Sequence, residues 1–183
     1  SEAFVTHLLA GLDAVEGLAA VVLDADALNA LARTPGWYER LALPRILTPH
    51  PAEMARLAGI EVAQVLAARL DTALGYAAHS GSIVVLKGAC TIVAHPDGRA
   101  RISGVSTSAL AHAGSGDVLA GLIAGFLAQG LDAFDAASAG VAVHAECGRI
   151  AEQRLGAAST LASDLLRLLP DLRRTLDSRD SGH

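Results

Sequence analysis

The segment from Ala113 to Gly121 reads AGSGDVLAG and combines residue types that suit phosphate chemistry. Gly114 and Gly116 stand on either side of Ser115, directly before an apolar run that predicts a helix. Glycines let a backbone approach a ligand closely, and the free N–H groups of a helix start favour an anion. Asp117 falls in the first helical turn, where its carboxylate could accept the proton of an attacking hydroxyl. Alone, the motif is explained better by an aspartate that stabilises a helix start, but the long Ser/Thr/Ala-rich loop before it favours a nucleotide site.

A lysine follows the strongest strand signal of the chain. Ile83–Leu86 is a β-branched apolar run, and Lys87 and Gly88 come directly after it. The carboxyl ends of parallel strands are where α/β folds bind ligands, so Lys87 is a candidate contact to a nucleotide phosphate. The alternative is an ordinary exposed lysine at a strand end.

The run Thr48–Glu53, TPHPAE, also follows a short strand. Its two prolines restrict the backbone, so His50 and Glu53 are presented in fixed positions. This pattern predicts a loop that lines a substrate site. The alternative is a proline-rich turn in which Glu53 merely begins a helix.

Asp24 and Asp26 follow the short strand Val21–Leu23 at the same predicted edge of the sheet. They are candidates to face a substrate or a metal ion, and helix capping is the alternative for each. His144 lies in the middle of a predicted helix among Ala and Val, which indicates a core or pocket-edge histidine rather than a metal ligand.

The elements that must position these residues alternate along the chain, which predicts an α/β fold with a mainly parallel sheet. A helix is also predicted over residues 1–18. The predicted strands are 21–23, 45–47 and 82–86, with a hairpin of 91–94 and 99–103. The other predicted helices are 52–58, 61–79, 115–129, 132–155 and 163–176, the last interrupted by Pro170.

Composition excludes several classes of function. The 183 residues fit a single domain over 1–183, with 171–183 expected to be a flexible tail. A net charge of −5 argues against nonspecific nucleic-acid binding. We find no signal peptide and no apolar run long enough to cross a membrane. Cys90 and Cys147 show no CxxC or metal-ligand spacing, which favours reduced thiols and a cytoplasmic location.

Taken in order, these segments resemble the ribokinase-like superfamily and, within it, the ADP/ATP-dependent NAD(P)H-hydrate dehydratases. The TPHPAE loop distinguishes this family, whereas GSGD alone indicates only the superfamily. The matching segments are VVLDADALN (21–29), ILTPHPAEMARL (46–57), VVLKGACTIVA (84–94), AGSGDVLAGLIAGFLAQG (113–130) and VAVHAECGRIAE (141–152).

The resemblance implies a three-layer α/β/α fold and a lyase that repairs hydrated NADH or NADPH with ADP or ATP and Mg²⁺, and it suggests a homo-oligomer. Asp117 would be the catalytic base and also contact the substrate. The other implied roles are an anion hole of Gly114, Ser115 and Gly116; nucleotide contacts from Lys87, Gly88, Ala89, Cys90, Thr91, Thr107, Ser108 and Gly116; and substrate contacts from His50, Glu53, Asp24 and Asn29.

The chain departs from the family pattern in two places. Family members carry a further Gly-rich strand–helix region before this point, so the chain is expected to match the C-terminal two-thirds of the family domain and to lack its first strands. The loop Ser106–His112 also differs from the expected Asn/Gly/Pro-containing stretch.

Two rival functions stay open at this point. One is a superfamily kinase of a small vitamin-precursor alcohol, and the other is a noncatalytic nucleotide-binding fragment.

Overall fold

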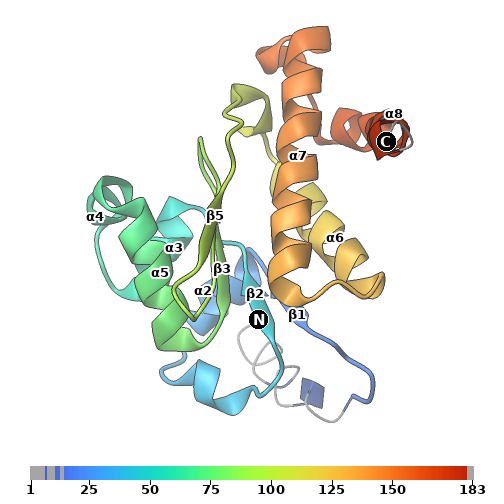
Figure 1. Ribbon diagram of the computed structural model, residues 1–183. Helices are drawn as coiled ribbons and strands as arrows, with labels where there is room; N and C mark the ends of the chain where they lie inside the picture. The colour runs from blue at the N-terminus through green and yellow to red at the C-terminus, as the bar shows by residue number, and fades with distance from the viewer. Residues whose placement is uncertain (1–6, 8–10, 13–14, 181–183) are drawn as a thin grey trace.

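A five-stranded mixed sheet forms the centre of the molecule (Figure 1). The computed structural model describes residues 7, 11–12 and 15–180, so the helix predicted over 1–18 falls largely outside the described residues. The strands are β1 (Val21–Leu23), β2 (Arg45–Leu47), β3 (Ile83–Leu86), β4 (Ile92–Ala94) and β5 (Ala100–Ile102), in the order β1-β2-β3-β4-β5. Strands β1, β2 and β3 pair in parallel, whereas β3–β4 and β4–β5 are antiparallel. The α/β class and the hairpin are confirmed. The sheet is mixed rather than mainly parallel, because the short connections after β3 and β4 leave no room for a crossover helix.

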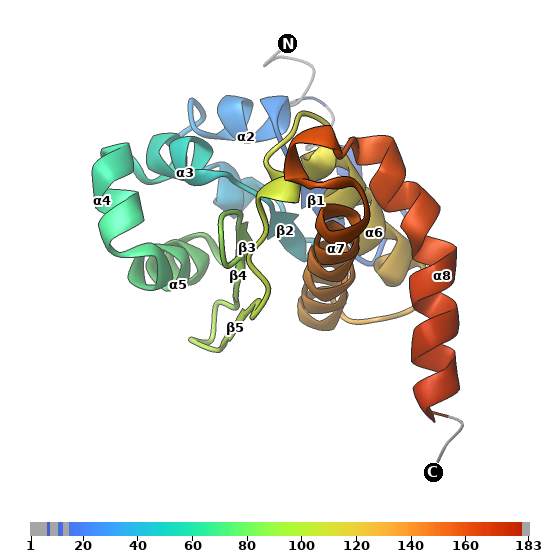
Figure 2. The same ribbon diagram turned by 90° about the horizontal axis from the view of Figure 1, so that it is seen from above.

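Helices cover both faces of the sheet, as the resemblance implied (Figure 2). The α-helices are α2 (Asp26–Leu31), α3 (Pro51–Ala58), α4 (Val62–Ala67), α5 (Arg69–Ser80), α6 (Ser115–Ala128), α7 (Ala133–Leu155) and α8 (Ala162–Asp180). Short 3₁₀ helices are η1 (Trp37–Arg40), η2 (Ser108–Leu110) and η3 (Ala157–Ser159).

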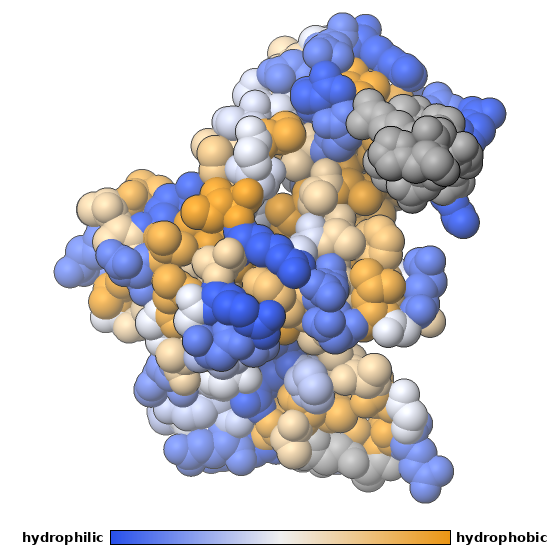
Figure 3. Space-filling view, in the orientation of Figure 1, coloured by the Kyte–Doolittle hydropathy of each residue, from blue (hydrophilic) through white to orange (hydrophobic). Residues whose placement is uncertain are grey.

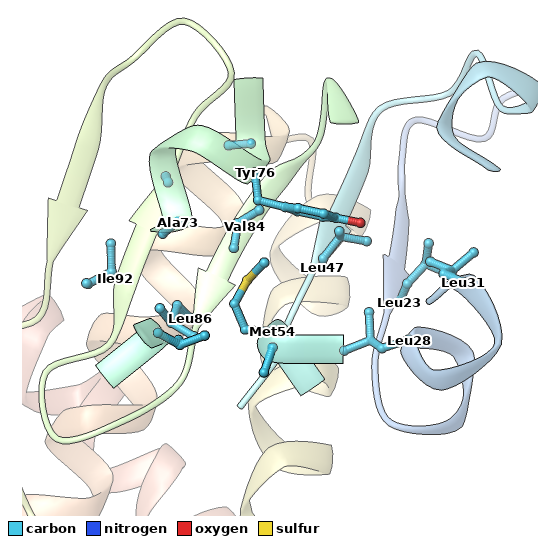
Figure 4. Packing of buried hydrophobic residues seen from close by; sticks show 14 of the residues in the cluster. Leu23, Leu28, Leu31, Leu47, Met54, Ala73, Tyr76, Val84, Leu86 and Ile92 are labelled. Carbon is cyan, nitrogen blue, oxygen red and sulfur yellow. The ribbon is translucent and has the colours of Figure 1, made fainter. Parts of the chain in front are cut away.

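Alternation along the strands divides the core into two layers. On β3, Val84 and Leu86 join the cluster formed with α2, α3 and α5, in which Met54 and Tyr76 fill the centre (Figure 4). Val85 faces the other way and packs with residues of α6 and α7. Successive side chains of a strand point to opposite faces, so one buried strand supplies both cores.

The carboxyl ends of the three parallel strands are linked to one another by hydrogen bonds. The Thr48 N–H donates to the Leu23 carbonyl at 3.1 Å, and the Lys87 N–H donates to the Pro49 carbonyl at 2.8 Å. These bonds fix the backbone on which the predicted site residues after β1, β2 and β3 stand.

Two helices differ from their predicted extents. The helix predicted over 61–79 is two helices, α4 and α5, because the chain leaves helical geometry at Ala68 (φ −138°, ψ 52°). The predicted interruption at Pro170 is wrong, since α8 continues through it to Asp180. The buried Leu165, Leu168 and Leu172 form an apolar stripe that crosses Pro170 and packs against α6 and α7. Residues 171–180 belong to this helix.

The surface seen in Figure 3 is a mixture of hydrophobic and hydrophilic areas. Within the described residues, no helix has both the length and the apolar character that crossing a bilayer requires.

Helices α6 and α7 pack closely because α7 carries glycine where α6 approaches. A Cβ added at Gly140 would lie 2.6 Å from Ile123 Cγ1 and 3.3 Å from the Ile123 backbone nitrogen. The backbone cannot give way as a flexible side chain could, so the two helices would have to separate.

We expect Gly140→Ala to lower the free energy of unfolding by about 1–3 kcal/mol, because the added methyl group overpacks the α6–α7 contact. Chemical denaturation would measure this loss. The matched control is Gly75→Ala at an exposed position of α5, where nothing lies within 4 Å of the new Cβ. The control should be neutral or stabilising, by up to about 1 kcal/mol. Equal stability of the two variants would contradict the close-packing argument.

Candidate active site

The start of α6 is capped by a glycine and connected to the loop before it. Gly114 caps the helix in the left-handed conformation (φ 85°). The Ser115 hydroxyl donates a hydrogen bond to the Leu110 carbonyl at 2.6 Å, which connects the helix start to the preceding loop. The first-turn N–H groups of a helix have no partner within it, and the helix dipole favours negative charge near them.

A cavity of about 380 Å³ opens beside this helix start. Its volume lies in the range of small-molecule sites. It is bounded by the loop after β3, the loop before η2, the start of α6 and one side of α7. The lining residues are Lys87, Gly88, Ala89, Thr91, Ser103, Val105, Ser106, Thr107, Ser108, Leu110, Ala111, Ser115, Gly116, Leu119, Val141, His144 and Ala145. All of the predicted nucleotide contacts except Cys90 therefore border one cavity.

Lys87 lies between two carboxylates at the edge of this cavity. Its Nζ is 2.9 Å from Asp24 Oδ1 and 4.0 Å from Glu53 Oε2. The side chains of all three residues are mostly buried. Gly116 lies against the pair, since a Cβ there would be 3.3 Å from Lys87 Nζ and 3.5 Å from Asp24 Oδ2. The strand ends and the helix start thus meet at one point.

His50 and Glu53 cap α3 together. His50 Nδ1 accepts hydrogen bonds from the Ala52 and Glu53 N–H groups at 3.1 and 3.2 Å. Glu53 Oε2 accepts from the His50 N–H at 2.8 Å. The cap explains the fixed presentation predicted for the two residues. About half of the His50 side chain (48%) is exposed, and it is not among the residues that line the cavity.

Asp117 lies on the other side of the helix start. It is exposed and borders a second hollow of about 420 Å³ between α6 and α8, together with Val118, Gly121, Leu122, Gly125, Phe126, Gln129, Leu166 and Leu169. Asn29 is half-buried on α2, and no side-chain hydrogen bond or ion pair connects it to Lys87 within the described residues.

Two parts of the site were not predicted from the sequence. Ser103, Val105 and Ser106 line the cavity, although the chain there carries no motif. Arg69 donates to the Cys90 carbonyl at 2.9 Å, 21 residues along the chain. The one sequence signal for this contact is Gly88, whose lack of a side chain leaves room for the Arg69 guanidinium.

Comparison with known proteins identifies the family. The family model described as NAD(P)H-hydrate dehydratase matches residues 4–171. The chain belongs to this family.

Its relatives are enzymes of nicotinamide nucleotide repair by name. The chain is 43% identical over 157 residues to the ADP-dependent (S)-NAD(P)H-hydrate dehydratase of Xanthomonas campestris, covering 86% of this chain and 53% of the relative. It is 44% identical over 156 residues to the bifunctional NAD(P)H-hydrate repair enzyme Nnr of Moorella thermoacetica, covering 85% of this chain and 29% of that protein. The chain thus spans about half the length of the single-function relative.

A solved structure of the same family superimposes on the fold. The ADP/ATP-dependent NAD(P)H-hydrate dehydratase of Bacillus subtilis, co-crystallised with ATP and Mg²⁺, matches with a TM-score of 0.78 at 35% identity. The match covers 85% of this chain and 55% of that one.

His144 is a buried titratable residue in the wall of the cavity beside Lys87. It lines the cavity from α7, as a pocket-edge histidine, and its Nε2 is buried without a hydrogen-bond partner. Its pKa is lowered from 6.5 to about 4, chiefly by burial; a backbone hydrogen bond with Ser115 opposes this shift and the nearby Lys87 charge adds to it. The imidazole is therefore neutral at neutral pH.

This neutral histidine should make stability depend on pH. The unfolded chain takes up the His144 proton near pH 6.5, whereas the folded chain resists it until about pH 4. The unfolded state binds more protons in that window, so stability falls as the pH drops from about 6.5 to about 4, by at most about 3 kcal/mol. His144→Gln should flatten this part of the stability–pH curve, measured by urea unfolding. The control His79→Gln, at an exposed position on α5, should keep the slope of the unchanged chain. If His144→Gln keeps that slope too, His144 is not the group responsible.

Proposed function

We propose that this chain carries the phosphoryl-transfer centre of an ADP- or ATP-dependent dehydration of hydrated NADH or NADPH. One observation carries the proposal: the start of α6 separates two hollows, with Ser115 and Gly116 on one and Asp117 on the other. A donor nucleotide on one side and an acceptor alcohol on the other would meet at the anion-binding helix end. Membership of the dehydratase family supports the choice of substrate.

The nucleotide side would be the cavity beside Lys87. Gly88 to Thr91 and Thr107 to Ser108 would contact the nucleotide, and Lys87 would attract its phosphates. The Lys87 ammonium is already near Asp24 and Glu53, so an arriving phosphate would share or displace those contacts.

The acceptor side would be the face of the helix start that carries Asp117. The carboxylate lies in the first turn of α6. A Cβ atom added at Gly114 would lie 4.0 Å from Asp117 Oδ2, so the carboxylate stays close to the helix cap. An exposed carboxylate there can accept the proton of a substrate hydroxyl. His50, Glu53 and Asp24 would contact the hydrated nicotinamide from the strand ends, with Asn29 further along α2.

The chemistry removes a hydroxyl group that is a poor leaving group. Asp117 takes the hydroxyl proton while the oxygen attacks the terminal phosphorus of the nucleotide, and the bond from that phosphorus to the bridging oxygen breaks. The resulting phosphate ester is a far better leaving group, since the second pKa of such an ester is about 6. Phosphate then departs with the C–O electron pair, the neighbouring carbon loses a proton, and the ring double bond forms again.

Mg²⁺ fits this arrangement as a companion of the nucleotide. Mg²⁺ is usually bound through one or two carboxylates plus substrate phosphates and waters. Among the described residues no group of three or more His, Cys, Asp or Glu side chains converges. A site shared with phosphates needs fewer protein ligands, and Asp24 and Glu53, the carboxylates beside Lys87 Nζ, would supply them. There the ion would neutralise charge on the transferred phosphoryl group.

We expect Asp117→Asn to lower the rate of NADH formation from hydrated NADH and ADP by about 10²-fold or more, because the hydroxyl proton loses its acceptor. The assay is the return of reduced-nicotinamide absorbance, with ADP binding measured in parallel by calorimetry. ADP affinity should stay unchanged, since Asp117 does not line the nucleotide cavity.

Asp71→Asn, an exposed carboxylate on α5, is the control and should behave like the unchanged chain. Full turnover by Asp117→Asn would refute the assignment of the base. An unchanged chain that binds ADP without turnover would favour the noncatalytic nucleotide-binding reading. A stable phosphorylated product would instead identify a kinase.

A further inference from the structure

Arg69 reaches from the first turn of α5 to the loop that follows β3. Its Nη2 lies 2.9 Å from the Cys90 carbonyl oxygen, 3.3 Å from that of Leu86 and 3.5 Å from that of Lys87. One guanidinium group therefore contacts the loop 86–91 at both its beginning and its end.

The loop is shaped to receive this side chain. A Cβ added at Gly88 would lie 2.6 Å from Arg69 Nη2 and 3.0 Å from Cζ. Glycine at this position leaves the space that the guanidinium occupies. Arg69 and Gly88 are thus complementary in shape, and a larger residue at position 88 would displace the arginine.

The contacts also determine which way the peptide groups of the loop face. In a trans peptide unit the C=O and N–H bonds point in opposite directions, and the chain has no cis peptide bond within the described residues. The carbonyls of Lys87 and Cys90 point toward Arg69, so the N–H groups of Gly88 and Thr91 point away from it. Both residues line the cavity beside Lys87.

Neither stabilisation of α5 nor an ion pair accounts for the position of the Arg69 side chain. A cation in the first turn of a helix opposes the helix dipole, so α5 gains nothing from it. Arg69 has no carboxylate within salt-bridge distance in the described part of the chain, and its Nε is buried without a hydrogen-bond partner. Its positive charge is thus met mainly by the loop carbonyls, and it adds to the attraction of this loop for an anion.

We propose that Arg69 is a positioning residue for nucleotide binding. It holds the loop 86–91 so that the Gly88 and Thr91 N–H groups face the cavity as hydrogen-bond donors. The identity of the ligand as an adenine nucleotide rests on the proposed function, whereas the ordering of the loop by Arg69 does not.

The test combines calorimetric titration of ADP with amide hydrogen exchange of the ligand-free chain. Arg69→Met should weaken ADP binding by about tenfold or more and speed exchange at residues 88–91, since charge-assisted bonds to the loop are lost. Arg69→Lys keeps the charge but not the forked donor geometry, and should give an intermediate result. The control Arg40→Met, at an exposed arginine of η1, should change neither quantity.

Gly88→Ala gives a second route that keeps the arginine. Its methyl group should displace the guanidinium and reproduce the loss seen in Arg69→Met. In the double variant the two effects should not add, because both remove one interaction. Thermal melting of each variant would identify general unfolding, in which case Arg69→Lys, the milder change, decides the result.

The outcomes separate this inference from the proposed function. Unchanged ADP affinity or unchanged exchange at residues 88–91 in folded Arg69→Met would overturn the role of Arg69. If the unchanged chain binds neither ADP nor ATP, the proposed function fails, and the exchange measurement alone still decides whether Arg69 orders the loop.

Discussion

The bond from the Lys87 N–H to the Pro49 carbonyl is short, 2.8 Å, and joins the ends of two parallel strands just where the chain leaves the sheet. The neighbouring bond from Thr48 to Leu23 does the same for β1 and β2. A strand end is normally free to fray, and side chains beyond it then have no fixed position. Here the backbone after β2 is hydrogen-bonded to the end of β1, and the backbone after β3 is hydrogen-bonded to the segment after β2. Consequently Asp24, Glu53 and Lys87 can form one cluster, although 63 residues separate the first from the last.

That cluster also explains why a lysine can stand mostly buried at the edge of a cavity. An ammonium group taken out of water needs a partner, and Asp24 at 2.9 Å supplies it. The close approach of α6 depends on the same point, because Gly116 leaves no side chain between the helix start and the Lys87–Asp24 pair. The glycines of the GSG segment therefore serve packing as well as ligand access. Gly114 takes the left-handed turn, and Gly116 allows the contact.

Local patterns in the sequence predicted much of this arrangement. The parallel strands β1, β2 and β3 were recognisable from short, largely apolar runs, and each led to a polar segment of the site. The nucleotide contacts proposed at Lys87, Gly88, Ala89, Thr91, Thr107 and Ser108 border one cavity because they follow strand and loop positions that the motifs marked.

Other features depend on contacts that no local pattern records. The chain turns at Ala68 without glycine or proline, and the turn places Arg69 at the loop after β3. A proline inside a helix usually interrupts it. Helix α8 nevertheless continues through Pro170, because Leu165, Leu168 and Leu172 are buried on one face. His50 and Asp117 do not line the cavity beside Lys87. His50 instead caps α3, and Asp117 faces the neighbouring hollow. Which way a first-turn side chain points depends on the angle at which the helix crosses the sheet, and tertiary packing sets that angle.

The separation of Asp117 from the Lys87 cavity follows from the helix itself. Successive residues of an α-helix are rotated by about 100° about the axis, so Gly116 and Asp117 must face different directions. A motif with glycine and aspartate side by side thus presents a bare backbone to one hollow and a carboxylate to the next. The close packing of Gly140 on Ile123 fixes the rotation of α6 and hence both directions. Such a divided end suits a reaction that joins a phosphate to an alcohol. Backbone N–H groups on one side would face the phosphate, and the carboxylate on the other side would accept the proton of the alcohol.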